Sequence, residues 1–590
     1  MKIVNSWNGH SLILNVSLVC ANVIGLIFFF AAFSPLFEDY KIALFSVSVL
    51  LILASIIGIF IFKGKELFAY VSRVLVGSFF IFSGLIKAND PIGFSLKLKE
   101  YFEDGAIAYR IKTWFNSPSF SLEYLIDYSL LLGVLLCILE IVIGVFLVLG
   151  AKGRLTSWLL MFLLLFFTFL TWHTATCNEK STFQDENMYL NNSLQGKSIM
   201  NQYLRESKNK VADKKIHSVQ KSGNQLIVTE FKSPQCVQDC GCFGDALKGV
   251  FGRSLLPVES FWKDCILLYF SVWIFLCRRR IYPNSVSQNL TLSSISLALI
   301  LVLCVIFNWY FPFLFCFSSL IASLWILKAG GKLLGNYGGS ALIISVMSVI
   351  MVVYILTHEP MKDYSPYAVG NNLKFKMNDG VVGTYASMLT YKNKKTGELR
   401  VYNSISKSYK QSNIDSNPSW KFNRMITKTI LPTKLPSITG QFDPVIKVKD
   451  LTKIDLRDPF LLKMKNQKIE TEEITIRNHI VNSPSIYLIV SNDFDHADWS
   501  NIRALKDLKL NADKKKTPMY LVSNSSYQKM EFWRKKHAVN IPLFTNDATE
   551  LKVIGRSNVL VVILKKGKVL GKYPLDDLPK IEWLTKYILN

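Results

Sequence analysis

Residues 125–150 read LIDYSLLLGVLLCILEIVIGVFLVLG, and Glu140 is the one charged residue after Asp127 in this stretch. A helix needs about 20 apolar residues to cross the hydrocarbon core of a bilayer, so the stretch predicts a membrane-spanning helix. Half of the 590 residues are hydrophobic, and they are gathered in blocks of similar length rather than in amphipathic stripes. We therefore expect a multi-pass membrane protein with an all-α bundle.

Similar apolar blocks on both sides of this stretch bring the expected number of spans to about nine. They cover approximately residues 12–33, 42–62, 68–88, 125–150, 154–173, 261–277, 290–309, 311–328 and 339–357. The first block is too long for the apolar region of a signal peptide and lacks a clear small-residue cleavage site, so we interpret it as an anchor. Omission of one span at the tight Trp309–Pro312 turn would move the C-terminal tail to the other side of the membrane.

Basic residues are concentrated in the short loops after the even-numbered spans. They are Lys63, Lys65, Lys152, Arg154, Arg278, Arg279, Arg280, Lys328 and Lys332. Positive loops favour the cytoplasmic side, so the N-terminus is expected inside and the C-terminal tail outside, in the periplasm of a bacterium. These loops and a lysine-rich tail account for the net charge of +25. With no zinc-finger spacing and no RNA-binding aromatic motif, nucleic acid is not an expected partner.

The ten cysteines all lie between Cys20 and Cys316, and four of them lie outside the apolar blocks: Cys177, Cys236, Cys240 and Cys242. They fall in the loop after span five, which the charge pattern assigns to the periplasm, where disulfides persist. Two thiols separated by one glycine would close a small strained ring, and strained disulfides are the labile, electron-accepting kind.

Three interpretations of these four cysteines remain open. Cys240 and Cys242 can form a redox-active pair, with Cys236 and Cys177 as relay or resolving thiols. Alternatively, all four form structural disulfides, in any of three connectivities. A four-thiolate zinc site is the third interpretation, but the one-residue spacing is poor for two tetrahedral ligands, so no metal is expected.

Ionisable residues within the spans are the other candidates for a site. Glu140 lies near the middle of its span, and the antiparallel span before it places Arg73 about one turn from the same depth, so a Glu140–Arg73 ion pair is expected. A proton-linked or quinone-linked role for Glu140 is the alternative. Lys87, at the end of span three, either extends to the interface or lines a quinone pocket. His173 shares a helical face with Cys177, where it would lower a thiol pKa or belong to an interfacial aromatic belt.

The tail after about His358 has a different pattern. Short β-like runs and a loop or linker at 411–445 precede an alternating α/β pattern. Strand-like runs at 485–490 and 519–522 alternate with helix-like runs at 499–510 and 528–537, and a hairpin at 559–570 precedes a helix at 578–589. This order is thioredoxin-like. Because Ser491–His496, after the first strand, contains no thiol, we expect this domain to bind a partner rather than to exchange disulfides.

Several segments together carry a family resemblance: Phe82–Phe94, Leu139–Gly144, Cys240–Asp245 followed by Phe261–Asp264, and Leu551–Asn558 with Gly567 and Leu578-Pro579. In combination they resemble the DoxX-like and MauE-like membrane proteins, in the long form found in Bacteroidetes bacteria. MauE-type proteins are associated with maturing a disulfide-rich periplasmic subunit of methylamine dehydrogenase, and DoxX-type proteins with quinone-linked membrane redox. The resemblance implies disulfide chemistry and a quinone as a possible cofactor, although Val559 follows Asn558 where the family usually has proline.

These observations predict five segments. They are two additional spans (1–67), a DoxX/MauE-like core with a periplasmic cysteine loop (68–289, loop 174–260), three further spans (290–357), a β-rich segment and linker (358–445), and a cysteine-free thioredoxin-like domain (446–590). The expected function is periplasmic thiol–disulfide or electron transfer at the inner membrane, and the candidate enzyme class is a quinone-linked thiol–disulfide oxidoreductase. Glu140, Arg73 and Lys87 are candidates for a quinone site or for a structural role. The expected partners are the lipid bilayer and an unknown periplasmic client. The alternative is a non-enzymatic scaffold or assembly factor with a structurally stapled loop.

Overall fold

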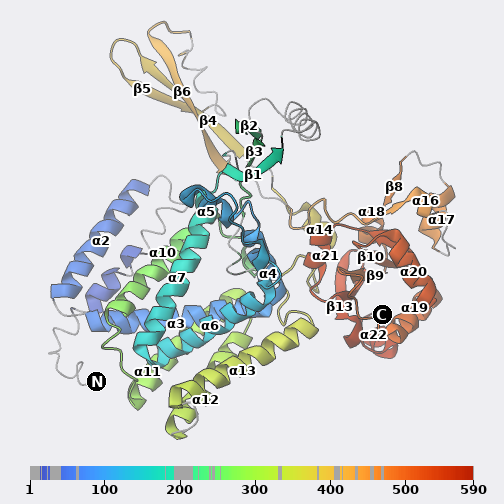
Figure 1. The fold of residues 1–590 in the computed structure, drawn as a ribbon, viewed down its shortest axis with the longest axis horizontal. Helices are drawn as coiled ribbons and strands as arrows, with labels where there is room; N and C mark the ends of the chain where they lie inside the picture. Colours follow the sequence, from blue (N-terminus) through green and yellow to red (C-terminus); the bar gives the residue numbers. More distant parts are fainter. Residues whose placement is uncertain are drawn as a thin grey trace. The chain divides into compact units, whose positions relative to one another are not determined.

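The computed structural model describes residues 14–588, except for 27–40, 62–64, 192–216, 330–334, 404–411, 432–435, 452–457, 467–470 and breaks of one to three residues elsewhere. Three of these short breaks, 238–240, 242 and 244–245, fall in the loop that contains Cys240 and Cys242. The chain divides into two compact units, Met1–Lys362 and Asp363–Asn590 (Figure 1).

The first unit is mainly helical. Its elements include α2 (Lys41–Ile61), α3 (Lys65–Asn89), α4 (Pro91–Phe102), α5 (Ile107–Phe115), α6 (Ser129–Leu149), α7 (Gly153–Thr176), α9 (Ala246–Phe251), α10 (Pro257–Leu276), α11 (Val286–Phe307), α12 (Phe311–Ala329) and α13 (Gly335–Thr357). Five of the described helices, namely α3, α6, α7, α11 and α13, are long and apolar enough to cross a membrane. They coincide with predicted spans three, four, five, seven and nine.

The other four predicted spans are not confirmed as membrane helices. The apolar parts of α2 and α12 are shorter, at Ser46–Gly58 and Phe311–Ile326. Helix α10 carries three charged residues, Glu259, Lys263 and Asp264, in its first half. Much of the first predicted span, 12–33, lies outside the described residues. The predicted turn between spans seven and eight is present, because α11 ends at Phe307 with Asn308 in the left-handed region (φ 47°) and α12 begins at Phe311.

Helices α3 and α6 form the centre of this unit, and glycines let them approach closely. A Cβ on Gly144 of α6 would lie 2.7 Å from the carbonyl oxygen of Gly77 on α3, and a Cβ on Gly84 would lie 3.1 Å from the carbonyl oxygen of Cys137. Small residues at such contacts are how membrane helices bring their backbones together. Gly77 therefore lies level with Gly144, and Gly84 level with Cys137.

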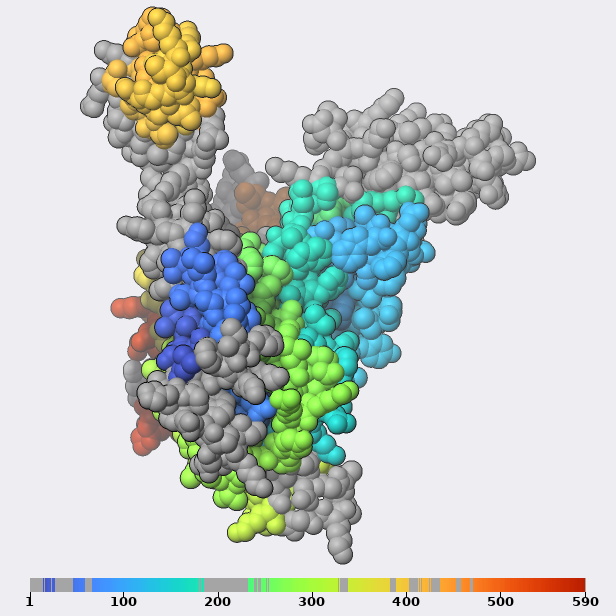
Figure 2. Space-filling view, turned by 90° about the vertical axis from the view of Figure 1, so that its left-hand side faces the viewer, coloured from blue at the N-terminus to red at the C-terminus, as the bar shows by residue number. Residues whose placement is uncertain are grey.

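Helix α10 completes the bundle against α3 and α7. Phe68 of α3 packs its ring against Phe270 and Trp273 of α10, with centroid separations of 5.8 and 5.0 Å. Figure 2 shows the green part of the chain, which includes α10, beside the teal part that includes α7. The loop between α7 and α10 contains a sheet that the sequence analysis did not predict: β1 (Phe183–Asn191), β2 (His217–Ser222) and β3 (Gln225–Lys232), antiparallel in the order β1-β3-β2.

The described residues of the second unit form two sheets. The strands are β4 (Thr384–Asn393), β5 (Leu399–Asn403), β6 (Trp420–Leu431), β7 (Val445–Lys447), β8 (Glu473–Thr475), β9 (Ile486–Ser491), β10 (Met519–Ser523), β11 (Leu543–Thr545), β12 (Val559–Lys565) and β13 (Lys568–Pro574). The first three form an antiparallel sheet in the order β5-β4-β6. Because β6 lies within 411–445, the prediction of a loop or linker there is wrong for these residues.

The larger sheet has the order β13-β12-β9-β10-β11-β7-β8. Strands β9, β10 and β11 are parallel, and β12 runs antiparallel to β9. The helices around it are α14 (Leu373–Asn378), α16 (Val448–Leu451), α17 (Pro459–Asn466), α18 (Arg477–Asn482), α19 (Ile502–Lys514), α20 (Tyr527–His537), α21 (Ala548–Ile554) and α22 (Ile581–Tyr587). Strands β9, β10, β12 and β13 and helices α19, α20 and α22 confirm the predicted runs. All side chains of β9 and β10 are buried, as expected for a central strand pair covered on both faces.

Candidate functional site

A buried ion pair joins the two central helices. The ammonium of Lys87 on α3 contacts Oε1 of Glu140 on α6, and the side chains are 3% and 2% exposed. Side chains on a helix tilt toward its N-terminus, and these two helices are antiparallel. Lys87 therefore extends back along α3 and Glu140 back along α6, so the two side chains meet near the level of Gly84 and Cys137.

Arg73 is not the partner of Glu140, so the predicted Glu140–Arg73 pair is wrong. Its Nε donates to the carbonyl of Leu147 at 2.9 Å, and Nη2 donates to Asn284 Oδ1 at 2.9 Å. The register at Gly77 and Gly144 places Arg73 level with Val148, eight residues or about 12 Å along the helix from Glu140. Its side chain also tilts away from Glu140. Arg73 instead holds carbonyl groups at the C-terminal end of α6, where a cation is favourable.

Lys87 contacts only one of the two carboxylate oxygens of Glu140. Its second oxygen, Oε2, is buried and has no hydrogen-bond partner. Lys87 Nζ also lies over the ring of Phe167, 4.3 Å from the centroid. Lys87 is therefore inside the bundle and does not extend to the interface.

A small pocket begins at Lys87. Its walls are formed by α3, α4 and α7, and the lining residues are Lys87, Phe94, Lys97, Leu98, Tyr101, Phe167, Leu170 and Thr171. Most of the walls are apolar. Lysine, tyrosine and threonine side chains supply hydrogen-bond donors, and the cavity, at about 10 Å³, has room for about one water molecule.

Asp264 is a buried acid that the sequence analysis did not name as a candidate site residue. It pairs with Lys263 at 2.9 Å and accepts a hydrogen bond from Thr171 Oγ1 at 3.0 Å. Thr171 also lines the pocket, so Asp264 fixes one wall of it. The sequence signal that could have identified Asp264 was the adjacent Lys263 and Asp264 inside the predicted 261–277 span.

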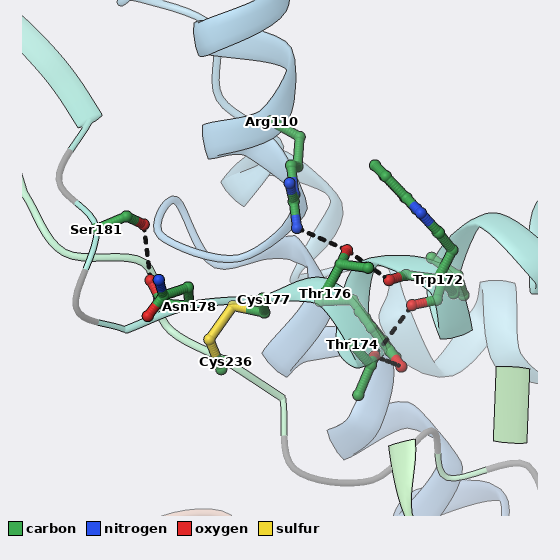
Figure 3. The surroundings of a disulfide bond; sticks show 10 residues. Arg110, Trp172, Thr174, Thr176, Cys177, Asn178, Ser181 and Cys236 are labelled. Atoms are coloured by element: carbon green, nitrogen blue, oxygen red, sulfur yellow. Dashed lines mark hydrogen bonds between the residues drawn. A yellow bond between two sulfur atoms is a disulfide. The ribbon is translucent and has the colours of Figure 1, made fainter. Parts of the chain in front are cut away.

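Two of the four loop cysteines are bonded to each other. Cys177, directly after α7, forms a disulfide with Cys236, with a Cα–Cα distance of 5.6 Å (Figure 3). Close by, Arg110 of α5 donates a hydrogen bond at 2.8 Å to Thr176, the last residue of α7. The disulfide joins the two ends of the segment that contains β1, β2 and β3. It leaves Cys240 and Cys242 as the other two cysteines of the loop.

Cys240 and Cys242 lie outside the described residues, but their neighbours on both sides are held by the bundle. Before them, the amide of Gln235 donates to the carbonyl of Gly105 at 2.8 Å, and Val237 is part of the hydrophobic core. After them, Phe243 packs between the rings of Phe79 and Phe307, at 5.7 and 5.8 Å.

Gly241, between the two cysteines, lies against the pocket wall. Its φ is +62°, and a Cβ at this position would lie 2.6 Å from Cγ of Lys97. Only glycine adopts this backbone conformation without strain and leaves room for such a close approach. Because Lys97 also lines the pocket, the backbone between Cys240 and Cys242 and the pocket share one side chain.

His173 is completely buried, and both of its ring nitrogens lack a hydrogen-bond partner. Its ring lies 5.6 Å from Tyr109 and 6.5 Å from Tyr101, and the hydroxyl of Tyr101 is 2.9 Å from Thr174 Oγ1. The structure therefore places His173 inside the bundle and not in an interfacial belt.

The described residues contain no group of three or more His, Cys, Asp or Glu side chains that could hold a metal ion. In the second unit, the segment after β9 is held by Asn558, whose amide donates to the carbonyl of Asp493 at 2.6 Å and accepts from its N–H at 2.8 Å. Asn558 directly precedes Val559, the first residue of β12 and the position where the family resemblance leads one to expect a proline.

Comparison with protein families matches residues 68–173 to the DoxX family. A search of the curated proteins and a search of the solved structures each found no match. The matched residues include Arg73, Lys87, Glu140 and His173. The DoxX domain at residues 68–173 supports the conclusion that this chain is a membrane protein of DoxX-like type.

Proposed function

We propose that this protein transfers electrons from thiols at a membrane surface, with Cys240 and Cys242 as the reactive pair. The observation that supports the proposal best is the position of Gly241, which lies against Lys97 on the wall of the pocket that begins at the Lys87–Glu140 pair. The Cys177–Cys236 bond supports it as well, because it leaves the two closely spaced cysteines as partners for each other.

The proposed reaction is a two-electron exchange. The Cys240–Cys242 disulfide oxidises two client thiols, whose sulfurs become bonded to each other, and the pair becomes a dithiol with two protons. Renewal of the disulfide requires an acceptor of two electrons and two protons. A quinone, the acceptor that the family resemblance suggests, supplies that chemistry when it is bound.

A quinone would require this water-sized pocket to widen, and the residues around it offer groups that such a molecule uses. Phe94, Leu98, Phe167 and Leu170 offer apolar walls, and the buried Oε2 of Glu140 has no hydrogen-bond partner. Lys87 and Tyr101 would donate hydrogen bonds to carbonyl oxygens. Glu140 and Lys87 would hold or release a proton, and Arg73 would keep its structural role at the end of α6.

The second unit is proposed to be a thioredoxin-like module that binds a partner without redox chemistry. The order β13-β12-β9-β10, with β9 and β10 parallel and β12 antiparallel, supports the fold. The absence of cysteine after Cys316 excludes disulfide exchange by this unit. In the proposed topology, nine helices of a bacterial inner membrane place the N-terminus in the cytoplasm, and the cysteine loop and second unit in the periplasm.

Paired cysteine substitutions test the proposal. The Cys240→Ala/Cys242→Ala variant is expected to retain normal abundance and thermal stability but to lose oxidation of a dithiol peptide by the purified protein with a soluble quinone analogue. The matched Cys177→Ala/Cys236→Ala variant should lose stability, because it opens a long loop whose closure contributes about 4 kcal/mol. Retained oxidation in the first variant would refute the proposal.

A non-enzymatic scaffold is the second candidate, and the Cys177–Cys236 staple is the observation that favours it. In that case Cys240 and Cys242 would also be structural, and their removal would lower abundance without changing any thiol oxidation. Alkylation of intact cells with a membrane-impermeant maleimide, with and without prior reduction, separates the two: a redox pair becomes reactive on mild reduction, whereas a structural bond does not.

A further inference from the structure

Helices α19, α20 and α22 cover the same face of the large sheet. Buried residues of all three, including Leu505, Trp533 and Leu584, belong to one hydrophobic cluster. Right-handed crossovers from β9 to β10 and from β10 to β11 require α19 and α20 to lie on the same side. The pKa of His537 on α20 is lowered by burial and then by the charges of Lys536 and Lys506, and Lys506 belongs to α19. The two helices are therefore neighbours, as Figure 1 also shows.

The outward side of each helix carries a large apolar residue among basic ones. On α19, Leu505 and Leu508 are buried, while Leu510 is 61% exposed and follows Arg503 and Lys506 at helical spacing. On α20, Met530 is buried and Phe532 is 71% exposed.

Helix α22 adds a pair of exposed aromatic rings to this face. The rings of Trp583 and Tyr587 are 5.2 Å apart, and Lys586 lies over the ring of Tyr587 at 5.0 Å. We call the surface formed by Leu510, Phe532, Trp583, Tyr587 and the lysines around them the helical face.

The three helices that form the helical face carry a net positive charge, although Lys529 pairs with Asp495 and Lys535 lies 3.6 Å from Glu531. The three helices carry nine Lys and Arg residues against four Asp and Glu residues. Two of the acids are already paired within the helices, Asp513 with Lys509 and Glu531 with Arg534. Lys535 and Lys536 are both exposed and lie one turn beyond Phe532.

We propose that the helical face binds the anionic surface of a lipid bilayer. Basic residues gain from anionic headgroups, while Trp, Tyr, Phe and Leu side chains enter the boundary between headgroups and acyl chains. The chain also keeps the second unit close to a bilayer, because this unit begins at Asp363, a few residues after the candidate membrane helix α13 ends at Thr357. The proposal does not depend on the thiol chemistry.

A fluorescent reporter on the full-length protein tests this. The Phe532→Cys variant is labelled with an environment-sensitive thiol probe and reconstituted in nanodiscs of phosphatidylcholine, alone or mixed with phosphatidylglycerol. With phosphatidylglycerol, the emission is expected to shift to shorter wavelength and to be quenched by spin-labelled lipids. Salt should reverse both changes, since it screens the lysines. The labelled unsubstituted protein gives the background from native cysteines.

The structure offers a matched control on the other side of the sheet. Phe375 on α14 is 67% exposed and is flanked by Lys374 and Lys376, and Leu373 of the same helix belongs to the opposite hydrophobic cluster. A label in Phe375→Cys is expected to show no lipid quenching.

Charge reversal adds a second measurement. Lys535→Glu/Lys536→Glu should weaken the association by at least about fivefold for each lysine removed, whereas Lys374→Glu/Lys376→Glu should leave it unchanged. Equal quenching at positions 532 and 375, or no quenching at 532 with anionic lipid, would overturn the proposal and leave an acidic protein as the partner to seek.

Discussion

At the residue scale, the Lys87–Glu140 pair is the feature that distinguishes the centre of the bundle. Two charges that are removed from water together cost free energy, and their attraction repays it only when the remaining polar atoms are satisfied. Here Oε2 of Glu140 is not satisfied. The pair is therefore poorly explained as a source of stability alone, which agrees with the proposed role of these residues in a site.

Substitution of one partner of the Lys87–Glu140 pair should lower the stability of the protein much more than substitution of both. Lys87→Met leaves a buried carboxylate without a counter-charge, so we expect a loss of about 3–5 kcal/mol in stability. Lys87→Met/Glu140→Leu should recover much of it. Arg280→Met is the control, because Arg280 pairs with Glu66 at 3.0 Å but is 57% exposed, and such pairs contribute about 0–1 kcal/mol. Thermal unfolding of the purified variants in detergent measures all three; a Lys87→Met variant as stable as Arg280→Met would contradict this.

His479 should make the second unit less stable in mild acid. Its ring stacks on Phe460 at 3.8 Å, and burial lowers its pKa below the ordinary 6.5, against an opposing effect of Asp458. As the pH falls below about 6.5, the unfolded chain binds the proton first, so folding free energy is lost as the pH approaches the lower folded pKa. Hydrogen exchange of β9 at pH 7.5 and 5.5 should show this loss in the unsubstituted protein and less of it in His479→Phe.

The control for this effect is His496, which is 82% exposed. His496→Gln should keep the acid-induced loss of protection in β9. If His479→Phe and His496→Gln respond to pH in the same way, burial of His479 is not the cause.

At the element scale, the contact between α3 and α6 depends on glycine. Gly144→Ala would place a Cβ 2.7 Å from a carbonyl oxygen of α3, and backbone cannot move aside as a side chain can. We expect a loss of about 1–3 kcal/mol. A Cβ on Gly133 of the same helix would meet only side chains, the ring of Phe94 at 3.3 Å and Leu98 at 3.6 Å, so Gly133→Ala should be neutral or up to about 1 kcal/mol more stable. Thermal unfolding of the Gly144→Ala and Gly133→Ala variants tests this. Equal changes in stability would show that the close approach of α3 and α6 does not require glycine at position 144.

Elements with a strong local pattern were predictable from the sequence, whereas partners across the fold were not. The apolar runs of β9 and β10 and the periodicity of α19 and α20 are local signals, and the structure confirms them. The three-residue strands β7, β8 and β11 are too short to give such a signal. The Glu140–Arg73 prediction failed because it used depth alone, whereas the partner is set by helix register and by the tilt of the side chains.

The cysteine loop shows the same limit. Proximity of Cys240 and Cys242 follows from their spacing, but the Cys177–Cys236 bond joins residues 59 apart, and sequence reasoning left its connectivity open. Contact of Gly241 with Lys97 depends on the path of the chain around α4. The role of Asp264 depends on a neighbour on another helix. Each of these facts requires the fold.

At the scale of the whole molecule, the number of crossings decides on which side the second unit lies, and α12, which follows α11 after a tight turn, is one of the helices on which that number depends. Helix α11, with 22 residues, is about 33 Å long, and the apolar part of α12, Phe311–Ile326, is about 24 Å long, against a hydrocarbon core of about 30 Å. Asn308 ends the first helix abruptly, so the pair should cross twice. Alkaline phosphatase, which folds only outside the cytoplasm, should be active when fused after Thr357 and inactive when fused after Arg280, and green fluorescent protein should give the reverse pattern. An inactive phosphatase after Thr357 would mean an even number of crossings and would place the second unit in the cytoplasm.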